Sequence, residues 1–233
     1  MPGKAPNHAN VRVSPSQAGR QLALSGAYGI FRNNSGLKIL LIALLVIDSM
    51  LALFVMITHQ VIEPEIFDRS TNRVAAILHG VDRGRMVSRI LAVFAFCYWI
   101  NRSCKNAWLL DPPKMRTTPT WAVGYYFIPV ISLWKPYVSM TEIRDASYGQ
   151  SEALSKLLPL WWICWIACLA LSLSHFSISH LLKDASTSEE TLSAAQKIST
   201  IGVPTHIILN YLTIVVIATI TRAQNSRAAQ WRP

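Results

Sequence analysis

"TTPTWAVGYYFIPVISLWKPYVSMTEIRDAS", residues 117–147, decides the fold because it is apolar enough for a membrane yet contains three prolines and a lysine. Its apolar part, residues 120–134, would cover only about 22 Å as a helix, less than the ~30 Å hydrocarbon core of a bilayer. Pro129 and Pro136 would also interrupt the hydrogen-bond ladder of a helix. The stretch therefore predicts a helical hairpin over residues 117–148 that dips into one side of the bilayer, or lies flat on it, without crossing.

The composition of the whole chain is typical of an integral membrane protein. Of 233 residues, 52% are hydrophobic and only 15% are charged, and the mean hydropathy is +0.31. Soluble domains have about 25% charged residues. The net charge of +10 could suggest nucleic acid, but the basic residues are scattered in ones and twos around apolar blocks. Such scattering is typical of membrane topology signals, so we expect no nucleic-acid partner.

Four segments have the length and hydropathy of transmembrane helices, and we expect an all-α membrane domain over residues 37–221. The second segment is the least apolar, because it includes Arg83, Arg85 and Arg89. Both flanking regions are predicted to be basic cytoplasmic tails, residues 1–36 disordered and residues 222–233 short. The predicted spans are residues 37–58, 74–103, 157–182 and 201–221.

The distribution of basic residues predicts the orientation. If the hairpin does not cross, both tails and residues 101–156 share one side, which then carries fifteen lysines and arginines against six on the other. In membrane proteins, lysine and arginine are more frequent in the loops and tails on the cytoplasmic side. Six of the tryptophans also fall near this side, where indoles prefer the interface. We therefore expect four transmembrane helices, both termini in the cytoplasm, and the hairpin on the cytoplasmic side.

Asp48 is the sharpest polar feature, because it lies near the middle of the first span. A carboxylate at that depth is costly unless it is paired or protonated. Asn210 lies at a matching depth in the fourth span, so we expect an intramembrane polar pair between Asp48 and Asn210. The pair could hold the helices together, or it could belong to a proton or ion relay.

Three histidines, His175, His180 and His206, are expected on the outer side and are candidates for a metal or haem site. The sequence contains no HxxxH or HExxH pair, so no cofactor is predicted. Catalytic signatures such as G-x-S-x-G or a P-loop are also absent, and we predict no catalytic residues and no enzyme. Glu142 and Asp145 share a helical face, which we expect to be solvated.

The hairpin resembles the signature of a bacterial membrane protein family, domain of unknown function 4328. In that signature, a Pro-x-Trp-Ala-Val-Gly opening leads to an aromatic pair, a proline and a Leu-Trp-x-Pro-Tyr close. The residues that carry the resemblance are Pro119, Trp121, Gly124, Pro129, Trp134, Pro136 and Tyr137. The resemblance covers about residues 70–220. It implies a multi-helix protein of the bacterial cytoplasmic membrane and implies no activity.

Three classes of function follow. The first is a non-enzymatic scaffold, sensor or regulator of a membrane partner, which would be another membrane protein or a second copy of this chain. The second is a small transporter or channel that uses Asp48 and a re-entrant hairpin. The third is a redox subunit that holds haem or a metal at the outer histidines.

Overall fold

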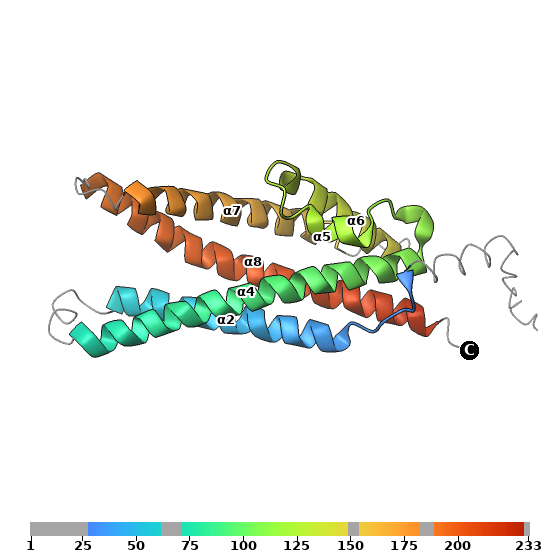
Figure 1. Cartoon of the computed structure of the whole chain (residues 1–233), viewed down its shortest axis with the longest axis horizontal. Helices are drawn as coiled ribbons and strands as arrows, with labels where there is room; N and C mark the ends of the chain where they lie inside the picture. Colours follow the sequence, from blue (N-terminus) through green and yellow to red (C-terminus); the bar gives the residue numbers. More distant parts are fainter. Residues whose placement is uncertain (1–27, 62–70, 149–153, 182–188, 231–233) are drawn as a thin grey trace, which may run out of the picture.

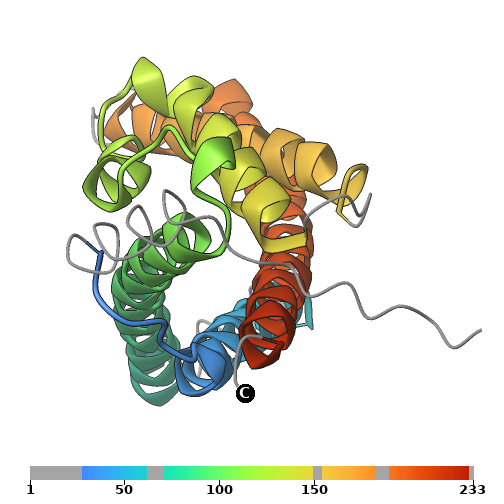
Figure 2. The same cartoon turned by 90° about the vertical axis from the view of Figure 1, so that its right-hand side faces the viewer.

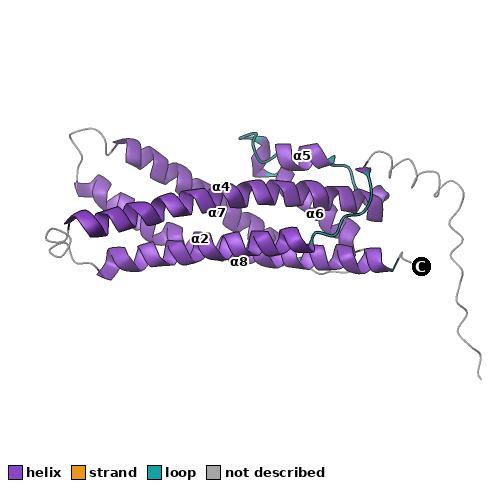
Figure 3. Cartoon of the chain, turned by 60° about the horizontal axis from the view of Figure 1, so that its bottom comes forward, coloured by secondary structure: helices purple, strands orange, loops and turns teal. Residues whose placement is uncertain are grey.

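The computed structural model describes residues 28–61, 71–148, 154–181 and 189–230, and four long helices dominate it (Figure 1). The long helices are α2 (Ser35–Val61), α4 (Thr71–Leu110), α7 (Leu157–Leu181) and α8 (Glu189–Ala229). The shorter elements between α4 and α7 are η1 (Pro112–Lys114), α5 (Pro119–Gly124), η2 (Ile131–Leu133) and α6 (Lys135–Tyr148). No strand occurs in the described ranges (Figure 3), so the predicted all-α class is confirmed.

Three of the long helices are long and apolar enough to cross a membrane. The qualifying segments are Ser35–Thr58 in α2, Leu157–Ser174 in α7 and Thr200–Ala229 in α8, with hydropathies of 2.8, 1.9 and 1.8. Helix α4 does not qualify, because the half nearer its start carries several charged side chains. Among the described residues, the chain thus has the helices of a membrane protein, with α4 as its most polar long helix.

Helices α4 and α8 extend far beyond the bounds predicted from hydropathy, whereas α2 exceeds its predicted bounds by only a few residues. Helix α4 has 40 residues instead of spanning residues 74–103, and α8 has 41 residues instead of spanning residues 201–221. Part of the polar connection expected before residue 201, and most of the tail expected after residue 221, are helical. Glu, Ala, Gln and Lys favour helix without being apolar, so hydropathy finds the lipid-compatible part of a helix and not its ends.

The long helices are arranged in an arc in the order α4, α2, α8, α7. Helix α2 packs on both α4 and α8, and α7 packs on α8. Helices α4 and α7 form the two ends of the arc and make no comparable contact with each other in the described residues. Figure 2 shows this arrangement along the bundle, with the chain end marked C toward the viewer.

The hairpin closes the arc at the end of the bundle where α2 begins and α8 ends (Figures 1 and 2). Helix α5 packs on α4, while α6 contacts α4, α7 and α8. At the opposite end the α7–α8 pair diverges from the α2–α4 pair (Figure 1). The bundle is therefore closed at the hairpin end and splayed at the other.

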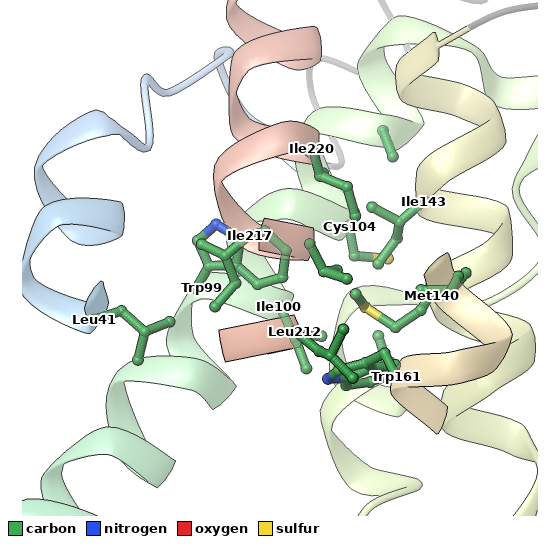
Figure 4. Close-up of a cluster of buried hydrophobic side chains, with 14 of the residues drawn as sticks. Leu41, Trp99, Ile100, Cys104, Met140, Ile143, Trp161, Leu212, Ile217 and Ile220 are labelled. Carbon is green, nitrogen blue, oxygen red and sulfur yellow. The ribbon is translucent and has the colours of Figure 1, made fainter. Parts of the chain in front are cut away.

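A cluster of buried apolar side chains fills the closed end (Figure 4). Two buried indoles satisfy their N–H groups across helices: Trp99 donates to Thr221 Oγ1 at 3.0 Å, and Trp161 donates to Thr213 Oγ1 at 2.9 Å. Such bonds matter in a region of low dielectric, where an unpaired N–H is costly. The other labelled members of the cluster are Leu41, Ile100, Cys104, Met140, Ile143, Leu212, Ile217 and Ile220.

The hairpin is anchored by a carboxylate that the sequence analysis placed in solvent. Helix α5 begins at Pro119 after Thr118, whose side chain makes no capping bond. Glu142 on α6 accepts hydrogen bonds from the backbone N–H groups of Arg116 and Thr117, at 3.0 and 2.8 Å from Oε2. Glu142 is therefore partly exposed, as expected of a solvated face, but it also binds two backbone N–H groups that the sequence did not predict. These two donors lie in a turn between η1 and α5, which hydropathy does not reveal.

The segment before α2 is packed, although residues 1–36 were expected to form a disordered tail. Tyr28 stacks on Trp108, and Asn106 Nδ2 donates to the Arg32 carbonyl at 2.9 Å. Asn34 is buried and donates to Ser103 Oγ at 3.1 Å. Residues 1–27 lie outside the described part of the chain.

Candidate functional site

Asp48 is buried in the middle of α2 and is held by two residues of α8. Its Oδ2 atom lies 3.0 Å from Asn210 Nδ2 and 2.7 Å from His206 Nε2. His206 and Asn210 are four residues apart and share one face of α8. The structure therefore brings together the two residues of the predicted polar pair and adds an imidazole that the sequence analysis had assigned to a possible metal site.

Arg89 of α4 completes the cluster from the other side. Its Nε lies 3.3 Å from Asp48 Oδ1, and about half of its side chain is exposed. Within the described residues, Oδ1 has no well-aligned hydrogen-bond donor. A buried carboxylate in a membrane region is tolerated when opposite charges and donors surround it. Asp48 thus connects α2 to α4 and to α8 at a single point.

Asn210 ties the same helices a second time. Its amide nitrogen lies 3.0 Å from Ser49 Oγ and 3.4 Å from the Leu45 carbonyl, in addition to its contact with Asp48. One amide therefore contacts three acceptors on α2. This geometry suits the structural role foreseen for the pair, because interhelical hydrogen bonds contribute directly to helix association in membranes.

A pocket of about 600 Å³ adjoins this cluster, between α4, α7 and α8. Two members of the cluster, Arg89 and His206, lie on its wall, together with Arg85. Asp48 is not among the lining residues and lies behind them. The remaining wall is formed by Trp165, Cys168, Leu169, Leu171, Ser172, Ile198, Gly202, Val203 and Leu209.

The pocket lies in the half of the bundle away from the hairpin. Its α4 residues precede residue 90, and its α8 residues lie between residues 198 and 209. This is the splayed half in Figure 1, whereas the apolar cluster of Figure 4 fills the half next to the hairpin. The described lining contains no residue of α5 or α6.

The charge on the pocket wall is basic. Arg85, Arg89 and His206 are its nitrogen-bearing ionisable side chains, and no Asp or Glu is found among the described lining residues. Arg85 is paired only loosely, since its Nη1 lies 3.6 Å from a carboxylate oxygen of the half-exposed Asp82. Its Nε is buried and has no hydrogen-bond partner in the described part of the chain. The guanidinium of Arg85 is therefore incompletely paired among the described residues.

The residues of the family-like hairpin form a separate region. Trp121 stacks on Tyr125, and a Cβ at Gly124 would lie 3.5 Å from the Trp121 ring, in ordinary contact. Pro129 accepts a bond from Ser132 at 2.7 Å through its carbonyl. Pro119 and Pro136 are buried, Trp121 and Trp134 are half exposed, and Tyr137 lies against Trp162. None of these residues reaches the Asp48 cluster among the contacts described.

Of the histidine candidates, the structure places His206 against Asp48. The side chains of His175 and His180 lie outside the described residues. In the described ranges no group of three or more His, Cys, Asp or Glu side chains is arranged to hold a metal ion.

Sequence reasoning missed Arg89 and His206 as partners of Asp48. The four-residue spacing of His206 and Asn210 was a usable signal, because it places both on one helix face. No comparable signal identifies Arg89, since its partner lies on another helix.

Comparison with known proteins gives one family. A family model described as "Domain of unknown function (DUF4328)" matches residues 64–222. The match includes α4, the hairpin, α7 and most of α8, and it begins after the end of α2. Comparison with curated proteins and with solved structures found no match.

Proposed function

Because the chain belongs to the DUF4328 family, a domain of unknown function, we propose its role from its own geometry. In this proposal it is a multi-pass protein of the bacterial inner membrane that binds a ligand in the pocket beside Asp48. Binding regulates a membrane partner, so the protein acts as a non-enzymatic sensor.

One observation carries the proposal: Arg89 and His206 each contact Asp48 and also line the pocket. A ligand that draws either side chain toward itself weakens its bond to Asp48. That bond joins α2 to α4 or to α8. Ligand occupancy is thereby coupled to the packing of the long helices, as a sensor requires, because a ligand shifts a conformational equilibrium only through contacts that differ between two states.

In this proposal α4 crosses the membrane in addition to α2, α7 and α8, so the chain crosses it four times. Support comes from the pairing of Arg89 with Asp48, which gives a charge in α4 a partner inside the bundle. Paired charges of this kind are tolerated in membrane helices. The excess of basic residues beside the hairpin supports cytoplasmic termini. A reporter fused after Pro233 should be active in the cytoplasm, and one inserted within residues 182–188 should be active outside; periplasmic activity of the first would overturn this topology.

The hairpin is proposed to lie in the cytoplasmic interface of the bilayer. Its exposed side chains include large apolar and aromatic groups, which suit the headgroup region. Lys135 lies 5.8 Å from the ring centre of Tyr125, so the surface also combines a cation with aromatic rings. The exposed groups are Trp121, Phe127, Val130, Leu133 and Trp134.

The test of the pocket uses two serines of α7 as a matched pair. Ser172 lines the pocket and Ser174 does not, yet both are exposed and both donate to the carbonyl four residues earlier. In a background without Cys97, Cys104, Cys164 and Cys168, each serine is replaced by cysteine and treated with a water-soluble maleimide from outside. Ser172→Cys should react faster than Ser174→Cys. Equal rates would show that the pocket gives residue 172 no better access to water than residue 174 has, and the sensor proposal would fail.

A small transporter is the second candidate, favoured by the burial of a carboxylate directly behind a pocket wall. A pathway through the hairpin requires the hairpin and the Asp48 cluster to line one cavity, whereas the described lining contains no hairpin residue. Labelling of Ser172→Cys from the cytoplasmic side as well, in inverted vesicles, would favour transport over sensing. A redox subunit requires a chromophore, so an absorption spectrum of the purified protein tests that third class.

A further inference from the structure

We propose that the pocket binds a single-chain amphiphile with an anionic headgroup, a carboxylate or a phosphate, held by Arg85, Arg89 and His206. This inference rests on the proposed function, since it names the class of ligand for the same pocket.

The residues of the pocket wall indicate that the ligand carries a negative charge. Its charged and imidazole side chains are bases in the described residues, and Asp48 lies behind them in contact with Arg89, His206 and Asn210. A cation entering the pocket would meet guanidinium groups before it met a carboxylate. An anion would meet donors first, so the site selects against cations.

Arg85 is the strongest single indication. A guanidinium carries five N–H donors in a planar fork that matches carboxylate and phosphate oxygens. The contact of Arg85 with Asp82 is long, at 3.6 Å, and Asp82 is 54% exposed, so water screens that pair. The Nε of Arg85 is buried without a partner among the described residues. An oxyanion in the pocket would supply a closer acceptor for the Arg85 guanidinium than Asp82 does.

The remaining lining residues indicate that the ligand carries an apolar tail. Leucine, isoleucine, valine and tryptophan side chains make up most of it. A volume of about 600 Å³ falls within the usual size of small-molecule sites. The pocket also lies between α4 and α7, the two ends of the arc, which do not pack closely on each other in the described residues. A ligand with an apolar tail can therefore reach the basic groups from the bilayer.

The experiment measures protection of Ser172→Cys from the maleimide, with the full-length protein in phosphatidylcholine nanodiscs. The probes are hexadecyl phosphate and hexadecanoate as anionic amphiphiles, hexadecanol as the neutral amphiphile, and inorganic phosphate as the headgroup alone. Arg85→Gln removes the proposed headgroup contact. Arg83→Gln is the matched control, because Arg83 is exposed on α4 and does not line the pocket.

Both anionic amphiphiles should slow the labelling, and hexadecanol should need at least about tenfold higher concentration. Arg85→Gln should raise the half-protecting concentration of hexadecyl phosphate by about tenfold or more, with Arg83→Gln unchanged. Equal labelling of the variants without ligand controls for folding.

Four results would overturn the inference. Equal protection by hexadecanol would identify an apolar site without charge selection. An unchanged Arg85→Gln would remove the headgroup assignment. Protection by inorganic phosphate at the same concentration as hexadecyl phosphate would identify a soluble anion as the ligand. If no probe protects Ser172→Cys while it still reacts faster than Ser174→Cys, the proposed ligand class is wrong. The water-accessible pocket of the proposed function would remain supported by that difference in rate.

Discussion

His206 Nε2 lies 2.7 Å from Asp48 Oδ2, and the same imidazole forms part of a pocket wall. The carboxylate on α2 and the pocket between α4, α7 and α8 are thus separated by a single side chain. A ligand in the pocket would therefore lie next to a contact between α2 and α8.

Replacing Asp48 by Asn should destabilise the protein by about 1–3 kcal/mol, because the change removes the charge that pairs with Arg89 and accepts from His206. The measurement is the free energy of unfolding in detergent. Asp82→Asn is the matched control, since Asp82 is half exposed and should change stability by less than about 0.5 kcal/mol. If the two variants are equally stable, Asp48 does not hold the helices.

A double-mutant cycle isolates the bond between Asp48 and Asn210. With both residues replaced by Ala singly and together, we expect a coupling of about 1 kcal/mol, within the range for polar contacts between membrane helices. The control cycle combines Asp82→Ala with Asn210→Ala, which share no described contact, and should give no coupling. A zero value in both cycles would mean that the 3.0 Å contact contributes nothing.

Glu142→Ala should cost about 2 kcal/mol, because it leaves the backbone N–H groups of Arg116 and Thr117 without their acceptor. Asp145→Ala on the same helix is the comparison. Asp145 is 43% exposed and pairs with its neighbour Arg144, so its loss should cost well under 1 kcal/mol. Thermal unfolding of both variants decides whether Glu142 anchors the hairpin; equal losses would mean that it does not.

Tyr148→Phe tests a pH dependence at the end of α6. Tyr148 donates to the Thr219 carbonyl at 3.0 Å, and burial raises the pKa of its phenol above the ordinary value of 10.0, partly offset by Arg222. The native state therefore holds this proton more tightly than the unfolded state, and its stabilising effect is lost as pH rises above about 10.

At pH 7 Tyr148→Phe should cost about 0.5–1.5 kcal/mol. Between pH 8 and 11 the variant should lose less stability than the unchanged protein, as followed by the thermal midpoint. Tyr211→Phe serves as the control, because Tyr211 is 65% exposed and makes no side-chain hydrogen bond among those described. A steeper loss in Tyr148→Phe would contradict the assignment.

Sequence patterns predicted the class of the fold and the family, because both depend on features that run along the chain. Hydropathy identified α2, α7 and α8, and the aromatic and proline pattern of the hairpin indicated the family that the comparison confirmed. Counting residues along two helices also placed Asp48 and Asn210 at one depth, and the structure brings them within 3.0 Å.

The remainder depends on how the helices are rotated and packed. The depth of a residue in the membrane can be counted from the end of its helix. The sequence does not show which face of one helix contacts which neighbouring helix, so Arg89 was not identified as a partner of Asp48. The function of Glu142 was hidden for the same reason, because the groups that donate to its carboxylate are backbone N–H groups in a turn far from it in the sequence. The lining of the pocket comes from three helices, so its basic residues could be recognised only once the positions of α4, α7 and α8 relative to one another were known.

Helix α8 has 41 residues, so it is roughly 60 Å long, and it passes His206 at the pocket before reaching Gln224 near its far end. Pro204 removes one rung of its backbone ladder beside the pocket, while residues 205–229 contain neither proline nor glycine. The backbone ladder of α8 is therefore weakened next to the pocket and uninterrupted by proline beyond it. Gln224 accepts from Asn106 Nδ2 and donates to the Ser103 carbonyl and to Ser147 Oγ, so a bend of α8 at Pro204 would also displace these three contacts at the hairpin end of the bundle.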